Sequence, residues 1–133
     1  MENVNVENIE IIRIDIYEDS IWASNKTIIN CRDMGNGIFR DIMFNNVHVE
    51  GNVHRLLGIN TGQGGILNGL TIKDLRIEGV LAHENYLSAE NGSISNILFD
   101  NVEANYMKIT NEFDAYIEKR GNVANIEFKW KNY

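Results

Sequence analysis

The chain has 133 residues, 44% of them apolar, and a formal net charge of −7. This acidic balance argues against nucleic acid as a partner, because phosphates call for a basic surface, and no apolar run approaches the roughly 20 residues of a membrane span. The single cysteine, Cys31, excludes a disulfide within the chain.

A short phrase, roughly Asn-apolar-x-apolar-x-Asn-apolar-x-apolar, recurs five times along the chain. Its copies begin, in chain order, at Asn8, Asp41, Gly69, Asn96 and Asn125. The first apolar residues of successive copies are 33, 28, 27 and 29 residues apart (Ile9, Ile42, Leu70, Ile97 and Ile126). A unit of this length is typical of a solenoid, in which each repeat buries its apolar face only against the next repeat.

Apolar and polar residues alternate inside each copy, which predicts strands and not helices. The second and third apolar positions are three residues apart, so two short strands are expected to meet at a bend. Asn46, Asp74 and Asn101 occupy that bend. Such residues tolerate left-handed backbone, and stacked amides can form a ladder between coils. Gly51 and Gly79 are predicted to mark a second corner.

Stacked copies of this unit predict an all-β fold, a right-handed single-stranded parallel β-helix (solenoid) of about four to five coils. The leucine-rich repeat is the alternative periodic fold, and its L-x-x-L-x-L-x-x-N line is missing. Residues 1–133 are expected to form one β-helix domain, either complete or as a fragment or C-terminal part of a longer β-helix. The first ten residues lack a secretory signal. The location is therefore unknown, and is secreted or periplasmic if the chain belongs to a longer enzyme.

Residues between the inward apolar positions are expected to face outward, in columns that run across the coils. One predicted column carries charges of both signs and suits cross-strand pairing (Asp15, His48, Arg76 and Glu103). A second column is mixed (Glu10, Met43, Thr71, Leu98 and Glu127). We interpret the first column as a solvated charge ladder.

Strands that lead into each coil are expected near residues 18–23, 54–60, 83–88 and 107–110. His54 and His83 are 29 residues apart, and so are Arg55 and Glu84. If the coils are in register, the imidazoles stack at about 5 Å and a salt bridge forms beside them. With Asp19 one coil earlier, the histidines would serve as acid and base or hold a metal. The alternative is a set of ordinary surface residues.

Two other features of the sequence bear on ligand binding. Trp22 would suit the apolar face of a sugar ring, or would pack against the core or its cap. The glycine-rich stretch at 61–65 precedes a strand. Because a phosphate-binding loop requires a following helix, a coil turn is the better interpretation.

Four stretches resemble the pectin-lyase-like β-helix superfamily, and most of all the later coils of glycoside hydrolase family 28, the polygalacturonases. GIFRDIMFNNVHVEG and GSISNILFDNVEA are similar to the family's coil connectors, EDSIWASNKTIINC to its D-D-x-I strand, and RLLGINTGQGGILNGLTI to its R-I-K-T strand with a glycine-rich turn. The resemblance implies a β-helix that acts on polysaccharide, with hydrolysis by carboxylate acid–base catalysis and no cofactor or metal.

The family's catalytic motifs are only partly matched. Glu18 and Asp19 stand where the family has D-D, and Gly58-Ile59-Asn60 stands where it has R-I-K. The chain has no G-H-G, and the coil with N-T-D would lie at or before its N-terminus. The catalytic set implied by the resemblance is therefore incomplete.

Two functional hypotheses follow. The first is a carbohydrate-active module related to polygalacturonase-like hydrolases, with polysaccharide or oligosaccharide as partner. Its candidate catalytic residues are Glu18, Asp19, His54 and His83, and its candidate substrate-binding residues are Trp22, Arg55, Asn60 and Glu84. The second is a non-catalytic structural or glycan-binding β-helix, similar to a tail-spike or adhesin, that forms a homo-oligomer through its exposed coil ends.

Overall fold

The computed structural model of the chain describes residues 1–14, 27–31 and 34–130. Within these ranges the secondary structure consists of strands, and no helix occurs. The strands are β1 (Glu2–Ile14), β2 (Thr27–Cys31), β3 (Ile38–Gly51), β4 (Arg55–Asn60), β5 (Ile66–Glu78), β6 (Asn85–Ala104), β7 (Met107–Lys108) and β8 (Ile117–Lys129).

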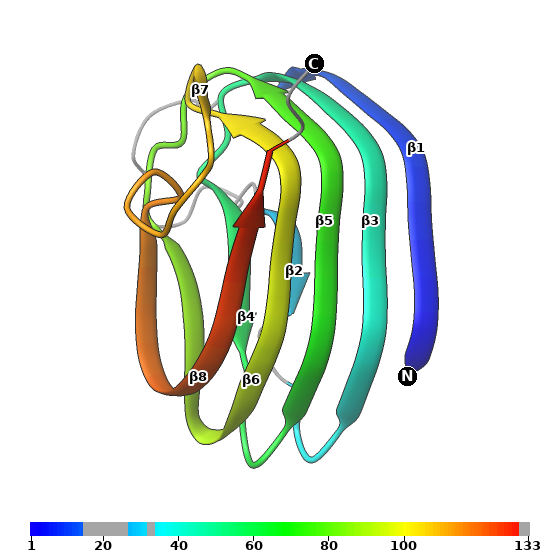
Figure 1. Cartoon of the computed structure of the whole chain (residues 1–133), viewed down its shortest axis with the longest axis vertical. Coiled ribbons are helices and arrows are strands. Elements are labelled where there is room, and N and C mark those ends of the chain that lie inside the picture. Colours follow the sequence, from blue (N-terminus) through cyan, green and yellow to red (C-terminus); the bar gives the residue numbers. More distant parts are fainter. Residues whose placement is uncertain (15–26, 32–33, 131–133) are drawn as a thin grey trace.

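Strands of successive coils stack in parallel, as Figure 1 shows for the run from β1 through β3 and β5 to β6. The sheet order is β1-β3-β5-β6-β4-β2, and β8 pairs with β6 in parallel. The long strand β6 belongs to two faces, because its first part pairs with β4 and its later part with β5. The chain is thus a parallel β-solenoid of about four turns, which confirms the predicted fold class.

The predicted bend is confirmed by the backbone. Asn46, Asp74 and Asn101 have φ angles of 57°, 51° and 61°, in the left-handed region that Asn and Asp tolerate better than other side chains. The ladder expected between coils is present as well: Nδ2 of Asn46 donates to Oδ1 of Asn8 at 2.8 Å, and Nδ2 of Asn101 to Oδ1 of Asp74 at 2.6 Å.

A second left-handed position lies five residues before the bend in each coil. It is occupied, coil by coil, by Asn3, Asp41, Gly69, Asn96 and Asn125. Where glycine takes this position, the preceding Asn68 accepts a hydrogen bond from Asn96 at 2.7 Å. Asn96 accepts in turn from Asn125 at 3.3 Å. Two polar ladders therefore run along the solenoid beside the apolar columns.

The predicted alignment of the first copy is wrong by five residues. Val4, not Ile9, pairs with Ile42, and Ile9 pairs with Val47. The charged column therefore begins with Glu10 beside His48, and the mixed column with Asn5 beside Met43. Asp15 lies outside the described residues. Asn3 and Asn8 are each followed by alternating apolar residues, so the local pattern permits both alignments.

The inward residues fill the interior of the coils. Ile72, Leu75 and Phe99 are at most 1% exposed, and full burial of such a side chain contributes about 1.5–3 kcal/mol. Phe99 also stacks on Phe128 of the next coil, with ring centroids 4.9 Å apart. At the outer strand β1, by contrast, Ile9 is 40% exposed.

The predicted glycine corner is confirmed, because Gly51 has a φ of 123° and packs directly against Gly79. A Cβ on Gly79 would lie 2.0 Å from the carbonyl oxygen of Gly51.

The prediction that a strand near 107–110 leads into a coil is wrong. Instead β7 turns back antiparallel on the end of β6, and β8 leads into the last coil from Ile117.

Candidate functional site

Two of the predicted histidines stack across successive coils. The rings of His54 and His83 have centroids 5.4 Å apart and planes within 5° of parallel, and the main-chain N–H of His83 donates to the carbonyl oxygen of His54 at 2.8 Å. This confirms the predicted one-coil relationship. His54 is only 7% exposed, so the imidazole belongs to the packed interior more than to the surface.

Arg55 contacts the next coil beside this stack. Its Nε–H donates to the main-chain carbonyl oxygen of Glu84 at 2.9 Å, and its guanidinium carbon lies 5.1 Å from the ring centroid of Tyr86. The predicted pairing of Arg55 with Glu84 is thus present as a hydrogen bond to the main chain, where a salt bridge to the carboxylate was expected. The cation–π contact further holds the guanidinium in place.

A hollow of about 310 Å³ opens over β4, β6 and β8 next to Arg55. It is lined by Arg55, Asn60, Glu84, Tyr86, Ser88, Glu118 and Arg120. The alternation of strands produces this set, since Tyr86 pairs with Gly58 and Glu118, and Ser88 pairs with Asn60 and Arg120. Three residues predicted to bind substrate, Arg55, Asn60 and Glu84, therefore lie in one place.

The charges around the hollow are balanced. Two arginines and two glutamates line it, and Arg120 donates from both Nε and Nη2 to Oε1 of Glu118, at 3.1 and 2.8 Å. This hydrogen bond and the charge of Glu118 raise the pKa of Arg120 above its ordinary value. The guanidinium is thus oriented at the rim of the hollow.

Asn85 holds the strands that carry the site. It is fully buried, and its Oδ1 accepts from the main-chain N–H groups of Leu56 and Leu57 at 2.7 and 2.9 Å, while its Nδ2 donates to the carbonyl oxygen of Ala115 at 2.6 Å. One side chain therefore ties β4, β6 and the segment before β8 together. Its polar atoms are satisfied, as burial requires.

Not all predicted site residues meet here. Glu18, Asp19 and Trp22 lie outside the described residues. His54 and His83, which directly precede Arg55 and Glu84 in the sequence, stack on each other and are not in the lining of the hollow. Four residues of the lining were not predicted from the sequence: Tyr86, Ser88, Glu118 and Arg120. The signal that would have found them is the outward alternation itself, continued from Glu84 along β6 and repeated in β8.

Fold and site together define a parallel β-solenoid protein with a polar, charge-paired hollow on one face. No family model matches the chain, and neither a curated protein nor a solved structure matches it. In the part of the chain that the structure describes, no helix is long and apolar enough to cross a bilayer.

Proposed function

We propose that the chain is a carbohydrate-binding β-solenoid module that holds a saccharide in the hollow over β4, β6 and β8. The observation that carries the proposal is the convergence of Arg55, Asn60 and Glu84 with Tyr86 around one concave site. Sugar hydroxyls both donate and accept hydrogen bonds. A guanidinium, an amide and carboxylates offer donors and acceptors at fixed planar angles for them.

The charge balance of the hollow favours a neutral sugar over a uronate polymer. Arg55 and Arg120 are offset by Glu84 and Glu118, and Arg120 is already bound to Glu118. A polyuronate would need uncompensated cations, whereas a neutral saccharide only exchanges water for hydrogen bonds with the lining.

The test is a glycan array that contains neutral and acidic oligosaccharides, followed by calorimetric titration of the best binder. Arg55→Ala and Tyr86→Ala should each weaken binding by about tenfold or more, since each removes a group that lines the hollow. Arg40→Ala is the matched control, because Arg40 is exposed on β3 and does not line the hollow. Absence of any bound saccharide, or equal weakening by Arg40→Ala, would refute the proposal.

Hydrolysis of a glycosidic bond is the second candidate, and the observation that favours it is the presence of two carboxylates, Glu84 and Glu118, in the same hollow. A pair of carboxylates is what acid–base hydrolysis of a glycoside requires. If the chain is a hydrolase, reducing ends should appear on incubation with polysaccharide. Glu84→Gln and Glu118→Gln should each remove most of that activity while saccharide binding remains measurable. Binding without release of reducing ends in the unaltered chain would leave the binding module and reject the hydrolase.

A homo-oligomer formed through the ends of the solenoid is also proposed. Strand β1 lies at one end of the sheet order, and Val4 and Val6 on it match Ile126 and Phe128 on β8 in coil position. Copies joined head to tail would continue the columns. Sedimentation velocity should show association that Val6→Lys reduces. A monomer at all concentrations would reject this arrangement.

A further inference from the structure

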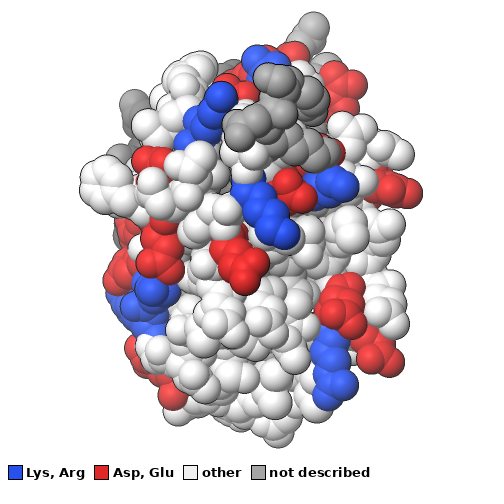
Figure 2. Space-filling view, viewed as in Figure 1, with Lys and Arg blue, Asp and Glu red and all other residues white. Residues whose placement is uncertain are grey.

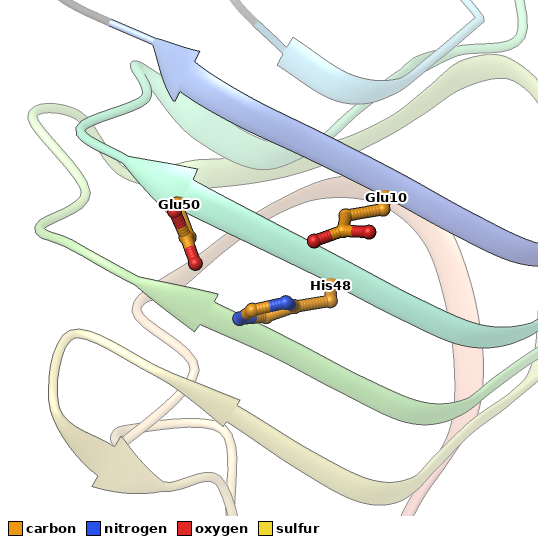
Figure 3. A group of neighbouring side chains, drawn as sticks. All are labelled: Glu10, His48 and Glu50. Atoms are coloured by element: carbon orange, nitrogen blue, oxygen red, sulfur yellow. The ribbon is translucent and has the colours of Figure 1, made fainter.

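A cluster of one imidazole and two carboxylates lies on the outer surface, away from the hollow. Glu10 on β1 pairs with His48 on β3, and Glu50 follows two residues later on the same face of β3. Figure 3 shows the imidazole with the carboxylate of Glu10 on one side and that of Glu50 on the other. One potential ligand atom from each residue lies within 4.8 Å of the other two.

Among the side chains that the structure describes, the charges next to this cluster are mostly negative. Arg76 is shared between Glu78, at 2.8 Å, and Glu103, at 3.5 Å. Among the described residues, no ion pair neutralises Glu10 or Glu50.

Like charges also stack here. Glu50 pairs directly with Glu78 of the next coil, and like charges opposite each other on adjacent strands are destabilising. Figure 2 shows charged side chains of both signs in the upper part of the view, where β3, β5 and β6 end, as well as along the left edge and at the lower right. A cation bound at the cluster would relieve this repulsion.

We propose that Glu10, His48 and Glu50 form a binding site for a divalent transition-metal ion of the zinc class. Zinc binds one imidazole nitrogen and carboxylate oxygens readily, whereas magnesium and calcium prefer oxygen alone. In a tetrahedral site with bonds of about 2.1 Å, ligand atoms are roughly 3.4 Å apart. The candidate ligand atoms lie within 4.8 Å of one another, so they must move closer together to bind an ion. The two glutamate side chains are long enough to do so. Three protein ligands leave the fourth position to water.

The second nitrogen of His48 has a carboxylate in the position that metal sites commonly use. Nε2 of His48 lies 3.2 Å from Oε2 of Glu78, is shielded from solvent and is not yet aligned for a hydrogen bond. Ion binding at Nδ1 would turn the ring so that Nε2–H donates to Glu78. A carboxylate that accepts from the other nitrogen orients a metal-bound histidine and raises its basicity. Arg76 pairs with the other carboxylate oxygen of Glu78, Oε1, at 2.8 Å.

The experiment is titration of the purified full chain with Zn²⁺ by calorimetry, together with the visible spectrum of the Co²⁺-loaded chain. We expect one ion per chain and a tetrahedral cobalt spectrum. His48→Ala, Glu10→Gln and Glu50→Gln should each weaken Zn²⁺ binding at least tenfold, and Glu78→Gln should weaken it about tenfold. The chain has only three histidines, so nitrogen-detected NMR can assign the shift on zinc binding to Nδ1 of His48.

The stacked histidines of the other face supply the control. His83→Ala removes an imidazole outside the cluster, and Glu127→Gln removes an exposed carboxylate on β8 that does not belong to it. Both variants should bind Zn²⁺ as the unaltered chain does, and circular dichroism will show whether each variant is folded. Loss of binding in His83→Ala with retention in His48→Ala would overturn the proposal, as would absence of zinc binding. Calcium binding as tight as zinc binding would overturn the assignment to the zinc class.

Discussion

Asn101 donates its side-chain N–H to Oδ1 of Asp74 at 2.6 Å, and both residues hold a positive φ at the same bend of successive coils. Two physical effects therefore meet at one position. The backbone requires a residue that tolerates the left-handed region, and the side chain stabilises the contact with the preceding coil by a hydrogen bond to a carboxylate.

Substitutions at Asn101 should separate these effects. Asn101→Ala loses both the hydrogen bond and the tolerance of positive φ, and should lower the free energy of unfolding by about 2–4 kcal/mol. Asn101→Gly loses only the hydrogen bond, and the decrease should be roughly half as large. Urea denaturation of the two variants measures the difference. Equal losses would mean that backbone conformation contributes nothing at this bend.

Asn85→Ala should destabilise the chain by about 3 kcal/mol or more, because it leaves the N–H groups of Leu56 and Leu57 and the carbonyl of Ala115 without a partner in the interior. Ser88→Ala, on the same strand but partly exposed, is the control and should change stability by about 0.5 kcal/mol or less. The measurement is chemical denaturation. A small effect of Asn85→Ala would show that water replaces the lost contacts.

Gly79→Ala should be strongly destabilising, by about 3 kcal/mol or more, since the new Cβ would lie 2.0 Å from the carbonyl oxygen of Gly51. Gly58→Ala is the matched variant. Its Cβ would meet only the outer ring atoms of Tyr86, at 3.2 Å, which move with the side chain. Thermal unfolding should show a much larger decrease in Tm for Gly79→Ala. Similar decreases for the two variants would contradict the close contact of the two corners.

Phe99→Leu should lower the free energy of unfolding more than Phe128→Leu. The two rings stack on each other, but Phe99 is fully buried, whereas Phe128, in the last coil, is partly exposed. Truncation to alanine at Phe99 should cost about 3–5 kcal/mol. Guanidinium titrations of the leucine variants provide the comparison. A larger loss from Phe128→Leu would mean that the last coil is packed more completely than its exposure indicates.

Much of the fold follows from the repeat. The spacing of Ile42, Leu70, Ile97 and Ile126 predicts the stacked strands, and Asn46, Asp74 and Asn101 predict the bend and its ladder. The sequence permits two alignments of the first copy, because Asn3 and Asn8 begin equally good phrases. Only the hydrogen bonds between β1 and β3 distinguish them.

The candidate site was predictable in part. Arg55 and Glu84 are expected from their spacing, and Asn60 from the resemblance to the R-I-K strand. All three lie in the hollow. Glu118 and Arg120 were not expected, because the segment between β7 and β8 differs in length from the earlier connections and conceals the register of the last coil. His54 was expected at the surface and is buried.

The sequence alone determined that the chain coils, where its apolar columns run and which residues form the bends, because these depend on short-range alternation and on a period of about 28 residues. Tertiary structure decided which polar side chains meet. The hollow at Arg55 and the cluster at Glu10, His48 and Glu50 each join residues from different coils, so their assembly depends on interstrand register, and register is a property of pairing between strands.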